Sequence, residues 1–416
     1  MMKTLLHKLA PRFVFDIYHL AWAHGSALWY GNPSKKLVVI GLTGTKGKST
    51  TAELVRTMLA GTGHKVAMAS TVRFMVGDVV ERNLFKMSMP GRGYLQQFLR
   101  QALDAGCTHA VMEMTSEGTL EFRHKGIELN ALIFTNLAPE HIERHGSFEA
   151  YVAAKLSLAE HLSRSGKRPR IIVANIDDTY GKDFLAVGAD IRAPFGLADA
   201  EPYTADDKSV RFLWKGVLFS IPLPGLFNLK NCLAALTLGQ ALGLSSEKMK
   251  QALEHVAPVA GRVQRIEQGQ PFAVVVDYAH TPDSLKALYE AYKNKRIIAV
   301  IGSTGGGRDT WNRPLKGAVT EEYADMTYVT NEDPYDEDPQ AILESVATGF
   351  TKRNPKLILD RRAAIAAAIG DAKDADDAVL ITGKGTDPYI MGPRGTKEVW
   401  SDAQVAQEEL IKLGYN

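Results

Sequence analysis

Short apolar runs alternate along the chain with longer stretches in which apolar residues recur every three or four positions. The first run covers residues 37–41, and Leu54, Val55 and Leu59 follow at helical spacing. Runs of this length are typical of buried parallel strands, so the alternation predicts an α/β fold with parallel sheets. The further runs expected to be strands are 110–114, 131–135, 171–174, 273–276, 297–301, 327–330 and 378–382.

Polar or glycine residues stand at or just beyond the ends of these predicted strands. Ligands of open α/β sheets bind outside the carboxyl ends of the strands, so a repeated polar end favours one extended active site along that edge. The residues concerned are Glu113, Asn136, Asn175, Asp277, Gly302, Asn331 and Gly383.

The segment GTKGKST, between the first strand and the first helix, has the composition of a phosphate-binding loop. Gly44 and Gly47 permit positive φ angles that turn backbone N–H groups inward, where the helix also offers its positive end. Lys48 adds a mobile charge, and Ser49 is placed to bind the magnesium of a nucleotide. The strict Walker pattern requires glycine where Leu42 stands, so this is a shortened variant, and an ordinary tight turn is the alternative. The expected nucleotide contacts are Gly44, Thr45, Lys46, Gly47, Lys48, Ser49 and Thr50.

A stretch containing Pro258 and Gly261 separates two sets of α/β alternations. We therefore predict an N-terminal aromatic-rich helical segment (1–36), a central parallel-sheet, P-loop-type ATP-binding domain (37–258) and a smaller Rossmann-like C-terminal domain (259–416). Residues 211–224 alternate weakly and are expected to form antiparallel strands at the edge of a sheet.

The first segment has some features of a signal peptide, but Lys8, Arg12 and Asp16 interrupt the apolar core that such a peptide requires. Residues 12–30 instead predict a helix that packs on the first domain, and a position on a membrane surface is the less favoured alternative. Its apolar residues include Phe13, Ile17, Tyr18, Leu20 and Leu28.

The 49 basic and 47 acidic residues leave a net charge of +2 over 416 residues, which argues against nucleic acid as the main partner. Cys107 and Cys232 have no metal-binding spacing, which fits the reducing cytoplasm. No apolar run reaches the roughly 18 residues that a membrane span needs. A cytoplasmic location is therefore expected.

A lysine falls on the apolar face of a predicted helix that starts near Gly146 and Ser147. Leaving the Lys155 charge unpaired there would cost roughly 3–5 kcal/mol, so the side chain needs a partner or a chemical change. A neutral amine can add carbon dioxide and become an anionic carbamate, which is an oxygen ligand for magnesium. A buried ion pair, or a stem that reaches solvent, is the alternative. The apolar face is formed by Phe148, Tyr151, Val152, Leu158, Ala159 and Leu162.

From about residue 37 to the C-terminus, a series of motifs resembles the Mur ligase family. The similarity is greatest to the MurE type, the UDP-N-acetylmuramoyl-tripeptide synthetases. The order of the motifs is more specific than any one of them. They are GTKGKST, VMEMTSEGTLEFR with Glu113, TNLAPEHIERHG with Lys155 beyond it, NIDD, GLFNLKNCLAA, GRVQRIE, DYAHTPDSL, GGGRDTWNRP and GKGTD.

The resemblance implies an ATP-dependent amide ligase. ATP would phosphorylate the carboxylate of a muramyl peptide, and the amine of a free amino acid would then displace phosphate. Lys48, Lys155 and His280 are the expected catalytic residues. Two magnesium ions would be bound by Ser49, Glu113, His141 and Lys155, the last as a carbamate. Ordinary loop contacts are the alternative for His141 and for His145.

The resemblance also implies further contacts to ATP. Asn175 and Asn231 would face the adenine, Asp277 the ribose, and Arg262 and His280 the phosphates or their surroundings. For each asparagine a loop hydrogen bond is the alternative.

The N-terminal part and the peptide-binding positions differ from the usual MurE pattern. Only residues 1–36 precede the first domain, so we expect no separate UDP-binding domain, and the carboxylate substrate is then either UDP-linked or lipid-linked. The family's serine-serine-histidine is Thr115, Ser116 and Glu117 here, and its paired threonines are Ser88 and Met89. The positions expected to contact the peptide are Ser88, Ser116 and Arg123.

The choice of amino acid is expected to lie in the last domain. Relatives that add diaminopimelate carry DNPR, whose arginine binds the distal carboxylate; here Glu332, Asp333, Pro334 and Tyr335 take those places. Because the surrounding run EDPYDEDP is acidic, we expect a diamino acid such as lysine or ornithine, unless the run is a solvated loop that caps a helix. The expected substrate contacts are Arg308, Asp333, Tyr335 and Asp387.

Two other functions remain open from the sequence. A folylpolyglutamate synthase has similar length and also lacks a UDP-binding domain, but its phosphate loop carries an extra glycine. A catalytically inactive binding subunit of the same fold would not need Lys48, Glu113 and Lys155 together.

Overall fold

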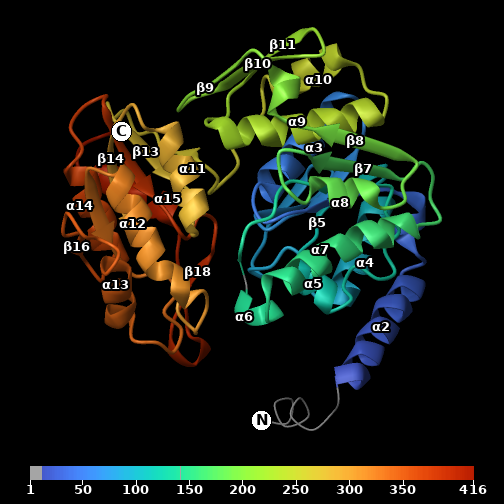
Figure 1. Cartoon of the computed structure of the whole chain (residues 1–416), viewed down its shortest axis with the longest axis horizontal. Helices are drawn as coiled ribbons and strands as arrows, with labels where there is room; N and C mark the ends of the chain where they lie inside the picture. Colours follow the sequence, from blue (N-terminus) through green and yellow to red (C-terminus); the bar gives the residue numbers. More distant parts are fainter. Residues whose placement is uncertain (1–11, 141) are drawn as a thin grey trace. The chain divides into compact units, whose positions relative to one another are not determined.

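The computed structural model describes residues 12–140 and 142–416 and groups them into two compact units (Figure 1). Unit 1 contains the described residues up to Pro139, together with His145–Ala200 and Lys230–Leu253. Unit 2 contains the described residues of Glu140–Arg144, together with Glu201–Leu229 and Glu254–Asn416. The domain limits predicted from the sequence stay a prediction.

Unit 1 is built on an eight-stranded sheet with the order β4-β3-β2-β5-β1-β6-β7-β8. The six strands from β2 to β8 in that order are parallel, and β3 and β4 add an antiparallel hairpin at one edge. The strands are β1 (Val38–Thr43), β2 (Val66–Ala69), β3 (Arg73–Val76), β4 (Val79–Arg82), β5 (His109–Glu113), β6 (Ala131–Phe134), β7 (Ile171–Asn175) and β8 (Ile191–Phe195).

Helices cover both faces of this sheet. On one face Leu99 and Leu158 pack with Met112, Leu132 and other buried residues, because their helices present apolar stripes to strands that are apolar on both sides. The helical segments of unit 1 are α2 (Arg12–Trp29), η1 (Pro33–Lys36), α3 (Lys48–Gly61), α4 (Arg92–Asp104), α5 (Ser116–Leu120), α7 (Phe148–Ser163), α8 (Gly181–Ala186), η2 (Leu197–Ala200), α9 (Leu226–Ala241), whose first residues belong to unit 2, and α10 (Ser246–Leu253). The short α6 (Ile142–His145) belongs to unit 2 as far as Arg144.

Unit 2 contains a six-stranded sheet with the order β12-β13-β17-β14-β15-β16, in which only β12 is antiparallel. Separate apolar clusters fill its two faces, one under α11, α12 and α13 and the other under α14 and α15. The elements are β12 (Gln264–Arg265), β13 (Ala273–Val276), α11 (Pro282–Ala291), β14 (Arg296–Ile301), η3 (Thr310–Asn312), α12 (Arg313–Tyr323), β15 (Met326–Val329), α13 (Pro339–Ala347), β16 (Lys356–Leu357), α14 (Arg361–Gly370), β17 (Asp377–Ile381), β18 (Tyr389–Met391), η4 (Pro393–Gly395), β19 (Lys397–Val399) and α15 (Asp402–Lys412).

The predicted α/β class is confirmed, and each predicted strand coincides with an observed one to within two residues at either end. The segment 211–224 does form antiparallel strands, β10 (Val210–Trp214) and β11 (Val217–Ile221). Its predicted place at the edge of a larger sheet is wrong, because these strands join β9 (Tyr203–Ala205) in a separate three-stranded sheet.

The predicted N-terminal helix is present as α2 and packs against α4, but not through the face that its large apolar residues suggested. Ala23 and Ala27 are buried, whereas Phe13, Ile17, Tyr18, Leu20 and Leu28 are exposed. Small side chains allow the helix to approach closely, and a helix that is apolar nearly all round can bury only one side. Among the described residues, no helix has the length and hydropathy needed to cross a bilayer.

Candidate functional site: a glycine loop and two lysines

The loop between β1 and α3 has the backbone conformation of a phosphate cradle. Gly44 has φ +146° and Gly47 has φ +82°, which residues with a side chain rarely adopt. A Cβ at Gly44 would lie 2.0 Å from Thr135 Oγ1, and one at Gly47 would lie 2.3 Å from Asn231 Oδ1. Both positions therefore require glycine for space as well as for conformation, and the N-terminus of α3 opens directly after Gly47.

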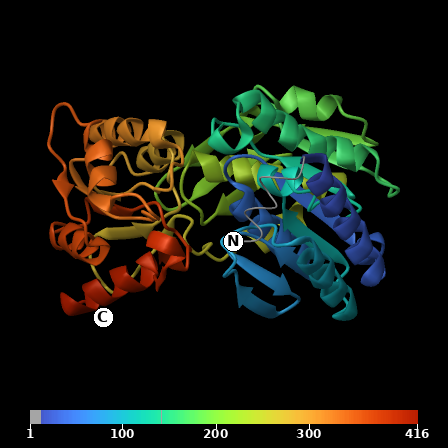
Figure 2. The same cartoon turned by 90° about the horizontal axis from the view of Figure 1, so that it is seen from below.

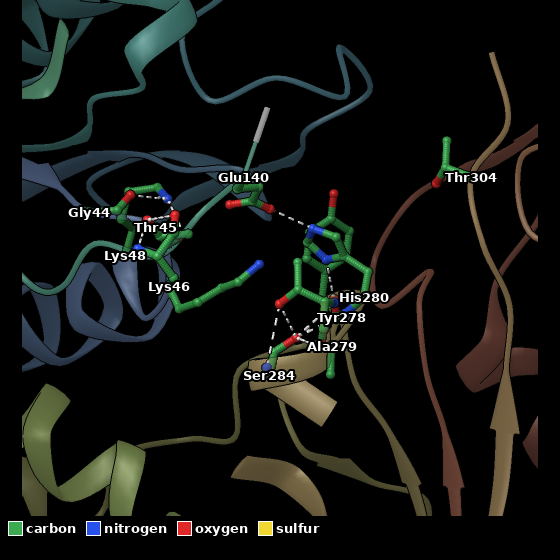
Figure 3. A network of polar contacts seen from close by, with 12 residues as sticks. Gly44, Thr45, Lys46, Lys48, Glu140, Tyr278, Ala279, His280, Ser284 and Thr304 are labelled. Atoms are coloured by element: carbon green, nitrogen blue, oxygen red, sulfur yellow. Dashed lines mark hydrogen bonds and ion pairs between the residues drawn. The ribbon is translucent and has the colours of Figure 1, made fainter. Parts of the chain in front are cut away.

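Two lysines meet at the carbonyl of Gly44. Lys48 Nζ donates to the carbonyl oxygens of Gly44 at 2.8 Å and Thr45 at 2.9 Å, as Figure 3 shows. Lys155 Nζ donates to the same Gly44 oxygen at 2.7 Å. The two ammonium groups thus reach one point of the loop from α3 and from α7, segments that are far apart in the sequence.

Local sequence explains how Lys155 reaches the loop from inside the protein. Ser147 caps α7 by accepting from Ala150 N at 3.2 Å, which fixes the start of the helix. Lys155 is 2% exposed and its Nζ lies 4.8 Å from the centre of the Tyr151 ring, while the Tyr151 hydroxyl lies 3.0 Å from Thr45 Oγ1. The predicted apolar face of this helix is confirmed, with the lysine on it.

Glu113 ends β5, the neighbour of β1, and is held by hydroxyl and backbone donors. Thr71 donates to it from its backbone N at 2.9 Å and from Oγ1 at 2.8 Å, and Ser88 Oγ donates at 3.2 Å. In the register of the sheet Glu113 lies beside Leu42, two residues before the glycine loop. Ser88, which we predict to contact the peptide, thus makes a hydrogen bond with Glu113, the predicted magnesium ligand.

The donor set at this edge suits magnesium. Ser49 is buried in the first turn of α3, and Glu113 supplies carboxylate oxygens, which are the hard ligands that magnesium prefers. Within the described part of the chain, no group of three or more His, Cys, Asp and Glu side chains could hold a metal ion. His141 lies outside the described residues.

The two asparagines predicted to face adenine make internal hydrogen bonds in unit 1. Asn175 Nδ2 donates to the Thr135 carbonyl at 2.9 Å, and its Oδ1 accepts from Asp177 N at 3.0 Å. Asn231 Oδ1 accepts from Thr51 Oγ1 at 3.3 Å and lies where a Cβ of Gly47 would be. Both therefore stabilise the backbone around the cradle.

In unit 2, Asp277 follows β13 and organises the next turn. Its two carboxylate oxygens accept from Val263 N and Ala279 N, each at 2.7 Å. Burial raises the pKa of Asp277, and the Arg262 guanidinium opposes that rise. The same guanidinium lies 4.3 Å from the centre of the Tyr278 ring.

His280, a predicted catalytic residue, is oriented from both ring nitrogens. Nδ1 lies 2.7 Å from the Tyr278 carbonyl, so it carries a proton and donates; Nε2 lies 2.7 Å from Glu140 Oε1 (Figure 3). The two contacts fix the orientation of the imidazole ring. Ser284 Oγ accepts from His280 N and, with Thr281, forms the capping box of α11, which holds the turn.

The predicted amino-acid site contains a buried ion pair. Lys384 Nζ contacts Asp333 Oδ1 at 2.7 Å and lies 3.6 Å from Asp387 Oδ2. The Arg308 guanidinium lies 4.9 Å from the centre of the Tyr335 ring, so all the predicted amino-acid contacts are near one another within unit 2.

The acidic run around Asp333 is largely used to hold the fold. Asp338 caps α13, Asp336 accepts from Arg394 N at 2.7 Å, and Glu337 pairs with Arg313 at 2.8 Å. The helix-capping alternative is thus right for Asp338. Glu332 differs: its Oε1 accepts from Thr304, and its buried Oε2 has no hydrogen-bond partner among residues 12–140 and 142–416.

The remaining predicted peptide contacts lie around α5. Ser116 Oγ is 3.1 Å from His145 Nε2, and Arg123 pairs with Glu121 at 3.0 Å and donates to the Met89 carbonyl.

Two further residues predicted to bind nucleotide are Lys46 and Thr50. The backbone N of Lys46 donates to Asn136 Oδ1 at 2.9 Å, and Thr50 is buried in α3.

Sequence reasoning missed three residues of these networks: Thr71, Glu140 and Lys384. Thr71 follows β2, which was not among the predicted strands. Glu140 belongs to the motif TNLAPEHIERHG, in which the sequence pattern pointed to the neighbouring histidines as the candidate ligands. Lys384 lies inside GKGTD, and the available signal in the sequence was a lysine between two glycines.

Comparisons with known proteins identify the family of the chain. Residues 42–239 match the Mur ligase middle domain, and residues 261–385 match the Mur ligase, glutamate ligase domain. A UDP-N-acetylmuramyl-tripeptide synthetase of Roseiflexus sp. (strain RS-1) is 35% identical, over 95% of this chain and 83% of that protein. A UDP-N-acetylmuramoyl-L-alanyl-D-glutamate–2,6-diaminopimelate ligase of Bacillus cereus is 33% identical, over 92% and 80%.

Solved structures show the same fold. A structure of a UDP-N-acetylmuramoyl-L-alanyl-D-glutamate–2,6-diaminopimelate ligase has a TM-score of 0.59 at 25% identity, covering 91% of this chain and 79% of that one. A folylpolyglutamate synthase of Mycobacterium tuberculosis has a TM-score of 0.71 at 17% identity, covering 88% and 93%, which is a likeness of fold alone. The chain belongs to the Mur ligase family of ATP-dependent amino-acid ligases.

Proposed function

We propose that this protein joins an amino acid to the carboxylate of a muramyl peptide in the synthesis of peptidoglycan precursors, with ATP as the energy source. The observation that carries the proposal is the meeting of Lys48 and Lys155 at the Gly44 carbonyl, inside a loop that only glycine can form. Both curated relatives described above are named for muramyl-peptide synthesis.

The proposed reaction has two steps. A carboxylate oxygen of the peptide attacks the γ-phosphorus of ATP, ADP leaves, and an acyl phosphate forms. The amino group then attacks the acyl carbon, the C–O bond to phosphate breaks, and the amine nitrogen loses a proton. Because carboxylate and triphosphate repel each other, the first step depends on cations, which Lys48 and the α3 N-terminus supply.

Magnesium, when bound, neutralises the charge of the phosphates. Ser49 and Glu113 would hold it, and His141 is a further predicted ligand. A carbamate on Lys155 would supply oxygen ligands for a second ion; carbon dioxide adds to the neutral amine, and one proton is released. The burial of Lys155 beside the loop supports this modification.

The amino acid that is added carries a second amine, as in lysine or ornithine. Tyr335 stands where a diaminopimelate ligase has an arginine, so unit 2 offers no arginine there for a distal carboxylate. Glu332 Oε2 is buried beside Gly302 and Gly383 and lacks a hydrogen-bond partner in the described part of the chain; the carboxylate also interacts electrostatically with the Arg361 guanidinium. An ammonium group of the substrate would satisfy this oxygen.

ADP release with UDP-linked and lipid-linked muramyl dipeptides, each with a panel of amino acids, tests the proposal. We expect release that requires both peptide and amino acid, with mass spectrometry showing the new amide. Lys48→Ala should lower the rate by about 10²–10³-fold, because it removes a preorganised cation, and exposed Lys182→Ala should not. Turnover of a folate substrate with glutamate, and of no muramyl peptide, would contradict the proposal. A cytoplasmic location stays a prediction.

A further inference from the structure

Most exposed residues of α2 between Phe13 and Trp29 are apolar; His24 is exposed as well, and Asp16 is half-buried. Among the exposed residues from Phe13 to Trp29 there is no Asp, Glu, Lys or Arg. Three of these side chains, Tyr18, Trp22 and Trp29, combine a large apolar ring with a polar atom, which is the type enriched where membrane meets water. The large exposed residues are Phe13, Val14, Ile17, Tyr18, Leu20, Trp22, Leu28 and Trp29.

The opposite face holds the helix firmly in unit 1. Ala23 and Ala27 are buried, and a Cβ at Gly126 would lie 2.9 Å from the Ala23 carbonyl oxygen. Figures 1 and 2 show α2 beside α4 along the outside of unit 1. The second half of α2 is therefore held by packing through Ala23 and Ala27, whereas no residue from Phe13 to Trp22 is buried.

A basic pocket of about 470 Å³ lies between α2, the turn after α5 and the end of α7. Lys125 and Arg164 line it together with the carboxylate of Glu128, which faces Lys35 Nζ at 3.6 Å; Arg164 itself lies 3.8 Å from Glu160, which does not line the pocket. The Lys125 ammonium makes no hydrogen bond or ion pair with any residue the structure describes. Burial lowers the pKa of Lys125 and Arg164 lowers it further, while Glu160 acts in the opposite direction; an anion in the pocket would also favour the charged ammonium.

The turn that carries Lys125 is strained. Phe122 has φ +56°, which is rare for a bulky residue, and it lines the pocket beside Leu20 and His24 of α2. Backbone strain of this kind clusters at functional sites. The turn also carries Arg123, so the pocket adjoins a predicted peptide contact.

We propose that this pocket binds the phosphate of an anionic lipid while the outer face of α2 lies in the membrane interface. A helix of 18 residues with one apolar, aromatic face and neighbouring lysines has the composition of an interfacial helix. Residues 1–11 add Lys3 and Lys8 and no acidic residue, which favours an anionic surface. The proposal goes beyond the ligase reaction and does not depend on it.

Co-sedimentation of the full chain with vesicles tests the proposal. We expect binding to vesicles rich in phosphatidylglycerol and much weaker binding to phosphatidylcholine alone. The double variant Trp22→Glu/Trp29→Glu should lower binding to both by about tenfold or more, because each charge would enter the interface. Lys125→Ala/Arg164→Ala should reduce only the preference for the anionic vesicles, by about tenfold. Val399→Glu, at an exposed site of unit 2, should bind as the unaltered protein does.

Two results would overturn the proposal. The first is an unaltered protein that stays in the supernatant with both kinds of vesicle. The second is a dimer, seen by light scattering, that the Trp22→Glu/Trp29→Glu variant dissociates, because the apolar face would then be an interface between copies. ADP release with a soluble peptide should be unchanged in these variants, so failure of membrane binding is distinguishable from failure of the ligase proposal.

Discussion

Lys48 and Lys155 donate to the same backbone oxygen, that of Gly44, at 2.8 and 2.7 Å. Two ammonium groups that share one neutral acceptor repel each other. The arrangement is stabilised when an anion is bound between them or when one of the two loses its positive charge. Binding of a triphosphate provides the first, and carbamate formation on Lys155 would provide the second.

The first prediction concerns Lys155. Lys155→Ala should lower ADP release by at least about 10²-fold, since it would remove the proposed carbamate ligand of an ion that stabilises the transferred phosphoryl group. If a carbamate is the active form, added acetate should restore part of the activity to this variant but none to Lys155→Arg, whose guanidinium occupies the space. Thermal unfolding curves of both variants show whether they are still folded. Full activity of Lys155→Arg would contradict the prediction.

The second prediction concerns the buried pair of Lys384 and Asp333. Lys384→Met leaves the Asp333 carboxylate buried without its counter-charge, so the free energy of unfolding should fall by about 3–5 kcal/mol. Lys293, in an exposed pair with Glu290, is the matched control, and Lys293→Ala should cost about 0–1 kcal/mol. Denaturant unfolding measures both, and equal effects would show that burial does not matter at Lys384.

The third prediction concerns pH. Burial, with His161 and Lys125 nearby, lowers the pKa of His124 from 6.5 to about 2. The unfolded chain therefore binds a proton below pH 6.5 that the folded chain does not bind until about pH 2, so stability falls over that interval as the pH falls. His124→Phe should flatten the dependence of unfolding free energy on pH below 6.5, whereas exposed His255→Phe should not. Parallel curves for all three proteins would contradict this.

The strands and the phosphate loop could be predicted because each rests on local sequence. A buried parallel strand is a continuous apolar run that ends at a polar residue, as at Glu113 and Asn175. The shape of the loop follows from Gly44, Gly47 and Lys48 alone. Lys155 was found for a similar reason, since its place on the apolar face is fixed by helical spacing.

Features that depend on distant contacts could not be predicted. The pattern of α2 shows apolar residues nearly all round, and only the packing of Ala23 and Ala27 against Gly126 and of α2 against α4 decides which side faces outward. The acidic run suggested an open acidic pocket. In the structure, however, Glu337 pairs with Arg313, and Asp336 accepts a hydrogen bond from the backbone N of Arg394. The donors that hold Glu113 come from Thr71, which follows the unpredicted strand β2, and from Ser88, 25 residues before Glu113 in the sequence.

The last prediction concerns the amino acid. Tyr335→Arg introduces a guanidinium where diaminopimelate ligases have one, so it should raise turnover of diaminopimelate relative to lysine by about tenfold through a bidentate contact with the distal carboxylate. Tyr335→Phe removes only the hydroxyl and should leave the ratio unchanged. Glu332→Gln should lower the kcat/KM for lysine and not for an uncharged amino acid. If the unaltered protein already prefers diaminopimelate, the distal carboxylate has another counter-charge, and the assignment of Glu332 to a substrate amine fails.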